Sequence, residues 1–236
     1  MTPEILPTDR WAASVAARLA ARLADPAGQR ICLPTGSTPA PVYVLVPAVL
    51  AELGADASAA TVVLLDEYLG LAPDDPARCD RMLRTQLIDR LDPPPRFVPI
   101  PVDDRTPEEA AAALDAAAAR LDLVVLGLGR NGHVGMNEPG SGPDAQTRAA
   151  PIQAATLRTA VEDYGAAGVP TGGVTLGMDR ILAATEVWLM VTGSAKASIL
   201  DQVLQGPMTA DLPASLLRDH GGLRVIADEA AAGSSG

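Results

Sequence analysis

The sequence predicts an α/β fold in which helices cover both faces of one doubly wound, mostly parallel sheet. Short, continuous apolar runs recur along the chain, and such runs are typical of strands buried on both faces. Segments of helical character separate most of these runs. The 236 residues suffice for one large core, and composition does not shift along the chain, so we expect a single domain over residues 1–236.

The predicted strands are seven short aliphatic runs at Arg30–Leu33, Val62–Leu65, Phe97–Ile100, Leu123–Leu126, Val174–Leu176, Val187–Val191 and Leu223–Ile226. The predicted helices cover Arg10–Ala24, Pro39–Leu53, Ala77–Leu91, Pro107–Arg120 and Lys196–Leu204. Because strand and helix alternate, the connections should be right-handed crossovers of a Rossmann-like sheet. In such a sheet, ligands bind beyond the carboxyl ends of the strands, so the residues that follow each strand are the candidates for function.

Charge and composition limit the classes of binding partner and the cellular location that we expect. The formal net charge of −11 opposes binding to nucleic acid and to anionic membranes. No apolar run approaches the roughly 20 residues that a membrane-spanning helix needs. The segment Met1–Arg10 lacks the basic and apolar regions of a secretory signal, so we expect a cytoplasmic protein. Cys32 and Cys79 form neither a CxxC pair nor a metal-binding cluster, and we expect reduced thiols and no metal site.

The first candidate motif runs from Leu33 to Pro39, between a predicted strand and a predicted helix, and reads LPTGSTP. Gly36 lets the backbone approach a ligand, while Ser37 and Thr38 offer hydroxyl and N–H groups at the positive end of the helix dipole. The motif therefore suits a phosphate. An ordinary strand-to-helix turn capped by Ser or Thr is an equal alternative on this evidence.

The second candidate is the carboxylate of Asp66, which follows the predicted strand and begins the string Asp66-Glu67-Tyr68. A carboxylate held at the end of a buried strand is partly desolvated, which raises its pKa and suits it to act as a base toward a carbon acid. The alternative is a structural role, as a helix cap or the partner of an arginine.

The third motif, residues 127–140, reads GLGRNGHVGMNEPG and follows the predicted strand Leu123–Leu126. Its glycines indicate close backbone packing, and within it His133 precedes Glu138 by five residues. A histidine oriented by a carboxylate or an amide is the usual proton shuttle near neutral pH. We favour that role over a histidine that only hydrogen bonds the loop backbone.

These three strings, in this order, resemble the glucosamine-6-phosphate deaminase branch of the family that also contains the 6-phosphogluconolactonases. The resemblance covers nearly the whole chain and includes GVTLG at residues 173–177, VTGSAK at residues 191–196 and His220. The DEY and NEP strings favour the deaminase branch. In the lactonase branch the corresponding strings typically read DER and continue from GH into a Thr-containing stretch.

The resemblance implies ring opening of an aminosugar phosphate, proton transfer between C2 and C1, and loss of ammonia to give fructose 6-phosphate, without a metal or organic cofactor. Asp66 matches the enolisation base. His133 matches the ring-opening proton shuttle. Glu138 matches the residue that orients and polarises it, and Asn131 stands at a further position of this ring-opening group. The phosphate-holding positions match Gly36, Ser37, Thr38 and Lys196. A monomer or small homo-oligomer is expected, and regulation by an N-acetylated sugar phosphate is not.

Two departures from the pattern concern the site. Asn131 stands where the family often has an aspartate, and an amide cannot stabilise an imidazolium by charge. The family usually carries a phosphate-binding arginine near the position of Glu162 or Asp163. Substitution by Arg158, one turn away, is the alternative to its loss. Loss of that arginine would cost about 1.5–3 kcal/mol for a charged hydrogen bond, so the substrate could differ from glucosamine 6-phosphate.

Two other functions stay open at this stage: a lactone hydrolase of the 6-phosphogluconolactonase type and a non-catalytic sugar-phosphate sensor. The sensor is disfavoured because only about thirty residues precede the first predicted strand, too few for a DNA-binding module. The segment from Gly140 to Gly173 is rich in small residues and low in strand signal, so we expect it to contain a mobile lid.

Overall fold

The computed structural model describes residues 2–153 and 165–233. Its main element is a sheet of seven parallel strands in the order β1-β10-β9-β6-β2-β3-β5. The strands span Glu4–Leu6 (β1), Arg30–Leu33 (β2), Thr61–Leu64 (β3), Arg96–Val98 (β5), Leu123–Gly127 (β6), Glu186–Val191 (β9) and Leu223–Asp228 (β10). The α/β fold with a mostly parallel, doubly wound sheet is thereby confirmed, whereas the single domain over residues 1–236 stays a prediction.

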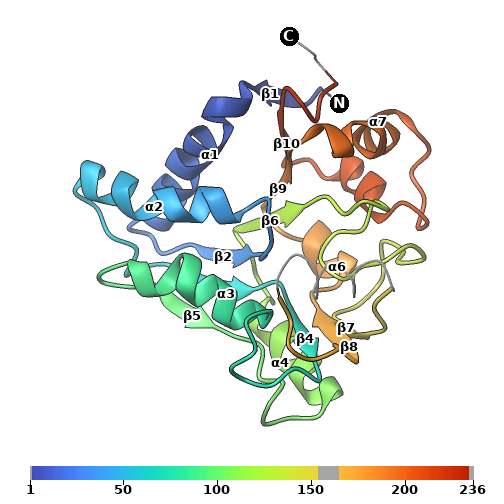
Figure 1. Ribbon diagram of the computed structural model, residues 1–236, viewed down its shortest axis with the longest axis horizontal. Coiled ribbons are helices and arrows are strands. Elements are labelled where there is room, and N and C mark those ends of the chain that lie inside the picture. The colour runs from blue at the N-terminus through green and yellow to red at the C-terminus, as the bar shows by residue number, and fades with distance from the viewer. Residues whose placement is uncertain (1, 154–164, 234–236) are drawn as a thin grey trace.

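Helices lie on both faces of this sheet (Figure 1). Two long helices, α1 (Thr8–Leu23) and α2 (Ala40–Leu53), pack together on one face, next to α3 (Cys79–Gln86). The helices α4 (Pro107–Ala117), α6 (Met178–Leu182) and α7 (Ala197–Gln205) lie on the other side. Short 3-10 helices span Ile88–Arg90 (η1), Ser194–Lys196 (η2) and Pro213–Asp219 (η3).

A second, antiparallel sheet of three strands begins next to the carboxyl end of β3. It contains β4 (Asp66–Leu69), β8 (Gly172–Thr175) and β7 (Arg148–Ala150), in the order β4-β8-β7. Only Leu65 separates β3 from β4, so the chain passes directly from the parallel sheet into the antiparallel one. The sequence prediction did not contain this second sheet.

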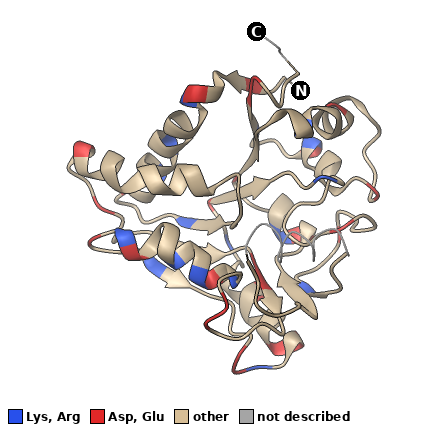
Figure 2. Cartoon of the chain, in the orientation of Figure 1, with Lys and Arg blue, Asp and Glu red and all other residues tan. Residues whose placement is uncertain are grey.

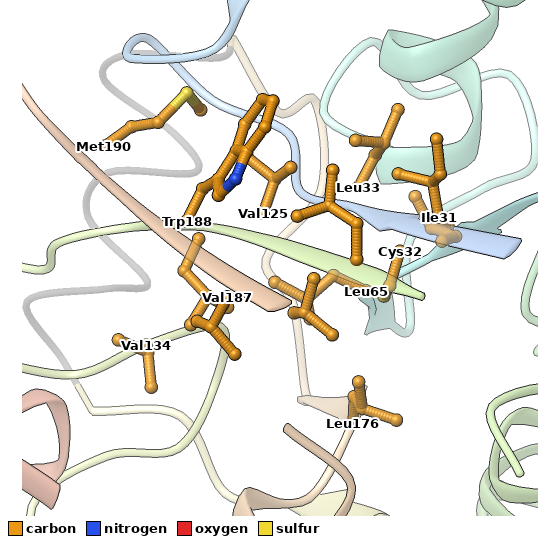
Figure 3. Close-up of a cluster of buried hydrophobic side chains, with 14 of the residues drawn as sticks. Ile31, Cys32, Leu33, Leu65, Val125, Val134, Leu176, Val187, Trp188 and Met190 are labelled. Carbon is orange, nitrogen blue, oxygen red and sulfur yellow. The ribbon is translucent and has the colours of Figure 1, made fainter. Parts of the chain in front are cut away.

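The core beneath the site joins the two sheets. Figure 3 shows apolar side chains of β2, β6 and β9 gathered with Leu65, Val134 and Leu176, which come from segments outside the parallel sheet. All three are fully buried. Leu65 precedes Asp66 and Val134 follows His133, so the packing of the core fixes the backbone that carries these two side chains.

Charged residues lie mainly on helices and loops, and the central strands of the parallel sheet are almost free of them (Figure 2). This distribution agrees with strands that are buried on both faces. Among the described residues, no helix is both long and apolar enough to cross a membrane.

Several predicted boundaries were wrong. The predicted helix Ala77–Leu91 is interrupted at Leu87 and continues only as the 3-10 turn η1. The predicted strand Val174–Leu176 belongs to the antiparallel sheet, as β8. The first strand is β1, which begins at Glu4, rather than the predicted strand at Arg30. Fewer residues therefore precede the first strand than predicted. Within the expected lid, β7 and β8 form regular pairs, and residues 154–164 lie outside the described residues.

Candidate active site

A cavity of about 350 Å³ opens at the carboxyl ends of β2, β3, β6 and β9. These four strands are neighbours in the order β9-β6-β2-β3, and the direction of winding reverses between β6 and β2. A crevice at such a switch point is the expected ligand site of a doubly wound sheet. Its lining consists of residues 34–39, Leu65, Asp66, Tyr68, Cys79, residues 127–131, His133, Gly135, Met136 and Lys196.

The segment after β2 forms one wall of the cavity. Gly36 is buried and has a φ of 120°, a conformation that residues with a Cβ rarely adopt. Its carbonyl accepts a hydrogen bond from the N–H of Ala40 at 3.2 Å, where α2 begins. Ser37 and Thr38 lie in the turn between them and line the cavity at the positive end of the α2 dipole, as the sequence predicted.

Asp66 occupies the point where the chain leaves β3. Only 8 % of its surface is exposed, yet it lines the cavity. Burial, and secondarily the neighbouring charge of Glu67, raises the pKa of Asp66 to about 7. A carboxyl with that pKa is partly ionised at neutral pH and can both take and return a proton.

Glu67 points away from the cavity and anchors α3. Its carboxylate accepts backbone hydrogen bonds from Tyr68 (2.7 Å), Cys79 (2.9 Å) and Asp80 (2.9 Å). Nε of Arg78 lies 3.3 Å from Oε2 of Glu67. Burial raises the pKa of Glu67, while these hydrogen bonds and Arg78 favour its charged form. Glu67 thus lies in the buried region behind Asp66, where its charged form favours the protonated form of Asp66.

Arg78 is itself fully buried and completes this anchor. Its two terminal nitrogens donate to both carboxylate oxygens of Asp103, at 2.8 and 3.0 Å. The bidentate pair ties the start of α3 to the loop after β5. Cys79, the first residue of α3, is thereby held at the cavity.

The segment after β6 forms a tight turn. The N–H of Gly132 donates to the carbonyl of Gly129 at 3.1 Å, and the N–H of Gly129 donates to the carbonyl of His133 at 2.9 Å. Arg130 and Asn131 are the two central residues of this turn, and both line the cavity. Gly132 has a φ of 82°, which the turn requires and which glycine adopts at little cost.

His133 packs directly on this turn and faces Glu138. A Cβ at Gly129 would lie 2.4 Å from Cδ2 of His133, so the imidazole occupies space that only a glycine leaves free. Nδ1 of His133 lies 3.4 Å from Oε2 of Glu138, within ion-pair range once the ring is protonated. The carboxylate of Glu138 is therefore placed to orient the imidazole ring.

Asn131 positions the loop rather than the imidazole ring. Its Oδ1 accepts a hydrogen bond from the backbone N–H of His133 at 3.2 Å. Its Nδ2 donates to Oε2 of Glu138 at 2.8 Å and to Oε1 of Gln153 at 3.2 Å. An aspartate at residue 131 would place a second carboxylate against Glu138, whereas the amide supplies a donor.

Gly135 brings the loop close to Asp66. A Cβ at this position, which has a φ of 58°, would lie 3.3 Å from Oδ2 of Asp66 and 3.0 Å from Oγ1 of Thr175. The loop that carries His133 and the strand that carries Asp66 therefore meet at a glycine, and both residues line one cavity.

Lys196 reaches the cavity from the end of β9. It is the N-cap of α7, the unfavourable end of the helix dipole for a cation. Its Nζ donates to the carbonyl of Leu128 at 2.6 Å, and burial, with a further contribution from Arg130, lowers its pKa. The sequence contains no other lysine.

Seven of the eight residues proposed from the sequence line the cavity, and Glu138 lies behind His133 and Asn131. Sequence reasoning missed Thr35, Tyr68, Cys79, Arg130 and Met136. All but Cys79 sit inside the three motifs, so position in the motif was an available signal. Arg158, Glu162 and Asp163 lie outside the described residues. In the described part of the chain, the cavity included, no group of three His, Cys, Asp or Glu side chains could hold a metal ion.

Comparisons with known proteins agree with this geometry. Residues 7–226 match the model of the family described as glucosamine-6-phosphate isomerases/6-phosphogluconolactonase. A glucosamine-6-phosphate deaminase of Leuconostoc citreum is 36% identical over 205 residues, 85% of each chain. A second, of Lacticaseibacillus paracasei, is 34% identical over 235 residues, 98% of each chain.

The solved structures give the same result. A monomeric glucosamine-6-phosphate deaminase superposes with a TM-score of 0.91 at 26% identity, over the full length of both chains. A 6-phosphogluconolactonase from Shewanella baltica has a TM-score of 0.76 at 21% identity, covering 97% of this chain and 98% of its own, and shares the fold. With its cavity at the switch point and its motifs on the adjoining strands, the chain belongs to the glucosamine-6-phosphate isomerase/6-phosphogluconolactonase family.

Proposed function

We propose that the protein converts glucosamine 6-phosphate and water to fructose 6-phosphate and ammonia. The observation that carries this proposal is one cavity lined by a buried carboxyl with a pKa of about 7, Asp66, and by a histidine backed by a carboxylate, His133. A reaction that opens a sugar ring and then moves a proton between carbons needs both groups. The curated relatives named as glucosamine-6-phosphate deaminases support the same reaction.

Ring opening is the task of His133. With Nδ1 turned toward Glu138, Nε2 is the nitrogen that exchanges a proton with the sugar. The imidazole of His133 takes the proton of the C1 hydroxyl and returns it to O5 of the sugar as the C1–O5 bond breaks. Glu138 stabilises the imidazolium between these steps, and Asn131 holds Glu138 in place.

Isomerisation is the task of Asp66. Its carboxylate takes the C2 proton of the open-chain aldehyde while a proton of the 2-ammonium group passes to O1, which gives an enolamine with a C1 hydroxyl. The carboxylic acid of Asp66 then returns the C2 proton to C1. The product is an imine at C2. Water adds to the imine carbon, ammonia leaves, and fructose 6-phosphate remains, so that the atoms of the substrate and one water are conserved. Partial ionisation of Asp66 at neutral pH suits both directions of the transfer.

The phosphate is held where Gly36, Ser37 and Thr38 present N–H and hydroxyl groups at the start of α2 and Lys196 adds a positive charge. We further propose that the protein acts as a monomer or small homo-oligomer in the cytoplasm, in agreement with the monomeric deaminase of the same fold.

The test compares the wild type with Asp66→Asn, measuring ammonia and fructose 6-phosphate separately after addition of glucosamine 6-phosphate. We expect equal release of both products by the wild type and a loss of about 10²–10⁴-fold in kcat for Asp66→Asn, the usual contribution of a general base. Asp89→Asn, at an exposed carboxylate outside the cavity, is the matched control.

Full activity in Asp66→Asn would overturn the role of the base. A wild type that hydrolyses 6-phosphogluconolactone and releases no ammonia from glucosamine 6-phosphate would overturn the reaction and assign the lactonase branch.

A further inference from the structure

Arg130 and Lys196 are cations of the cavity that have no acidic partner among the described residues. The chain is acidic, with 29 Asp and Glu against 18 Lys and Arg. Ion pairs with carboxylates form at several other arginines, namely Arg18, Arg22, Arg78, Arg180 and Arg224. Lys196 instead contacts a neutral carbonyl, that of Leu128. Two unneutralised cations in one cavity of an acidic protein indicate a site for an anion.

Arg130 projects from a rigid base. It is a central residue of the turn closed by Gly129 and Gly132, and its neighbour Asn131 is tied by side-chain hydrogen bonds to His133 and Glu138. The N–H of Ala214 donates to the carbonyl of Gly132 at 2.9 Å, which fixes the turn from a second side. The side chain of Arg130 is exposed and lines the cavity.

The two cations are close enough to repel each other. Burial lowers the pKa of Lys196, and the charge of Arg130 lowers it further. An anion placed between them would convert this repulsion into two attractions. Lys196 also stands out by residue type, because every other basic position among the 18 is an arginine. A compact ammonium can donate to Leu128 and to a ligand at once.

We propose that Arg130 is the second cation of the phosphate subsite and binds, together with Lys196, the phosphate monoester of the sugar. Arg130 thus supplies, from the turn after β6, the guanidinium that the family pattern places near residues 162–163. The inference rests on the proposed function for the identity of the sugar, whereas the anion site stands on the two cations themselves.

The first test measures KM for glucosamine 6-phosphate and the inhibition constant of inorganic phosphate in the wild type, Arg130→Met and Arg130→Lys. We expect Arg130→Met to raise both constants by about 10- to 30-fold, the lower part of the range for a charged hydrogen bond because the side chain is exposed. The kcat should change less than about threefold. Arg130→Lys should recover part of the affinity, since it restores the charge but not the paired N–H donors of the guanidinium. Arg120→Met, at an exposed arginine outside the cavity, is the control and should match the wild type.

The second test uses Lys196 as a probe, because it is the only lysine. Reductive methylation with ¹³C-formaldehyde labels Lys196 and the terminal amine and keeps their charge. NMR titration should give a higher pKa for Lys196 in Arg130→Met than in the wild type, and a higher pKa in the wild type once inorganic phosphate is added. The terminal amine should respond to neither change.

The outcomes separate the two proposals. Deamination with unchanged KM and phosphate inhibition in Arg130→Met would overturn the role of Arg130 and leave the proposed function standing. Phosphate binding that depends on Arg130, measured by the NMR titration in a protein that releases no ammonia, would support the subsite and overturn the deaminase.

Discussion

Asp66 combines two properties that oppose each other at the scale of the residue. The carboxyl must face the cavity to reach a substrate, and it must be dry to hold a pKa of about 7. The structure achieves both by burying it at the junction of β3 and β4, with Gly135 passing close above it. A base of this kind is held at a cost in stability.

That cost predicts that Asp66→Asn stabilises the fold while it removes activity. The pKa of Asp66 is raised from 3.8 to about 7, so the folded protein keeps a proton that the unfolded chain releases. Stability is therefore lost as pH rises from about 4 to about 7 and stays lost above that range, by at most about 4 kcal/mol at 1.36 kcal/mol per pKa unit.

Urea unfolding of the wild type and Asp66→Asn at pH 5 and pH 8 checks this expectation. The variant should gain more over the wild type at pH 8 than at pH 5. An equal gain at both pH values would show that the ionisation of Asp66 costs the fold nothing.

The sequence could supply most of the individual site residues because their motifs follow strands directly. Asp66, His133 and Lys196 were predicted and line the cavity. Arg130 was not, although it lies inside the third motif, because position in a motif does not assign the direction of a side chain at the tip of a turn. Its function depends on Lys196, which arrives from β9, some 66 positions further along the chain.

At the scale of the element, β4 and α3 form one unit with two faces. Asp66 is directed to the cavity, and the next side chain along β4, that of Glu67, receives the first backbone N–H groups of α3. Alternation along a strand explains this division, since successive side chains point to opposite faces. Glu67 therefore raises the pKa of Asp66 by its charge although its own side chain does not line the cavity.

We expect Glu67→Gln to move the acid limb of the kcat/KM profile to lower pH. Glu67 is the second cause, after burial, of the raised pKa of Asp66, and its neutralisation lets Asp66 ionise more readily. Asp103→Asn is the structural control, because it weakens the anchor of Arg78 and keeps the charge beside Asp66.

The expected order is a lower apparent pKa in Glu67→Gln than in both Asp103→Asn and the wild type, read from kcat/KM between pH 5 and pH 9. An acid limb that shifts equally in both variants would attribute the effect to movement of α3 instead of to charge.

The elements that sequence reasoning missed are short and paired at long range. β1, β4 and β7 have three or four residues each, which is too short for a clear strand signal. The strand β8 was predicted, but not its two adjacent glycines, which weaken the signal at its start, nor its antiparallel partners. The string DEYL carries two charges and resembles a loop after a strand. Only its pairing with β8, more than a hundred residues later, makes it a strand.

At the scale of the whole molecule, the site depends on parts of the chain that do not line it. Asp228, at the end of β10, is buried, and its carboxylate accepts hydrogen bonds from the N–H of Gly193 at 3.0 and 3.2 Å and from the N–H of Ala231 at 2.7 Å. Gly193 begins the turn that leads to Lys196. The strand next to β9 therefore fixes the position of a cavity residue.

We expect Asp228→Ala to weaken inorganic phosphate binding and to raise KM more than it lowers kcat, because Lys196 loses its support while Asp66 and His133 do not. The buried N–H of Ala231 and the half-buried N–H of Gly193 are left without this acceptor, and the loss at a buried N–H costs about 1–3 kcal/mol in the free energy of unfolding. Asp228→Asn retains an acceptor oxygen and should lie between Asp228→Ala and the wild type. Urea unfolding measures the loss of stability, and the inhibition constant of inorganic phosphate measures the loss of binding. An inhibition constant that is unchanged in Asp228→Ala would show that Asp228 does not support Lys196.

The place of β1 in the sheet sets the order in which the chain can complete its fold on the ribosome. β1 pairs with β10 alone, in the register Glu4↔Ile226, and Nε1 of Trp11 in α1 donates to the carbonyl of Ile226 at 3.1 Å. At a synthesis rate of about 5–20 residues per second, β1 waits on the order of 10–40 s for its partner. Throughout that interval the indole of Trp11 lacks its final partner, and nascent-chain chaperones have prolonged access to β1 and α1.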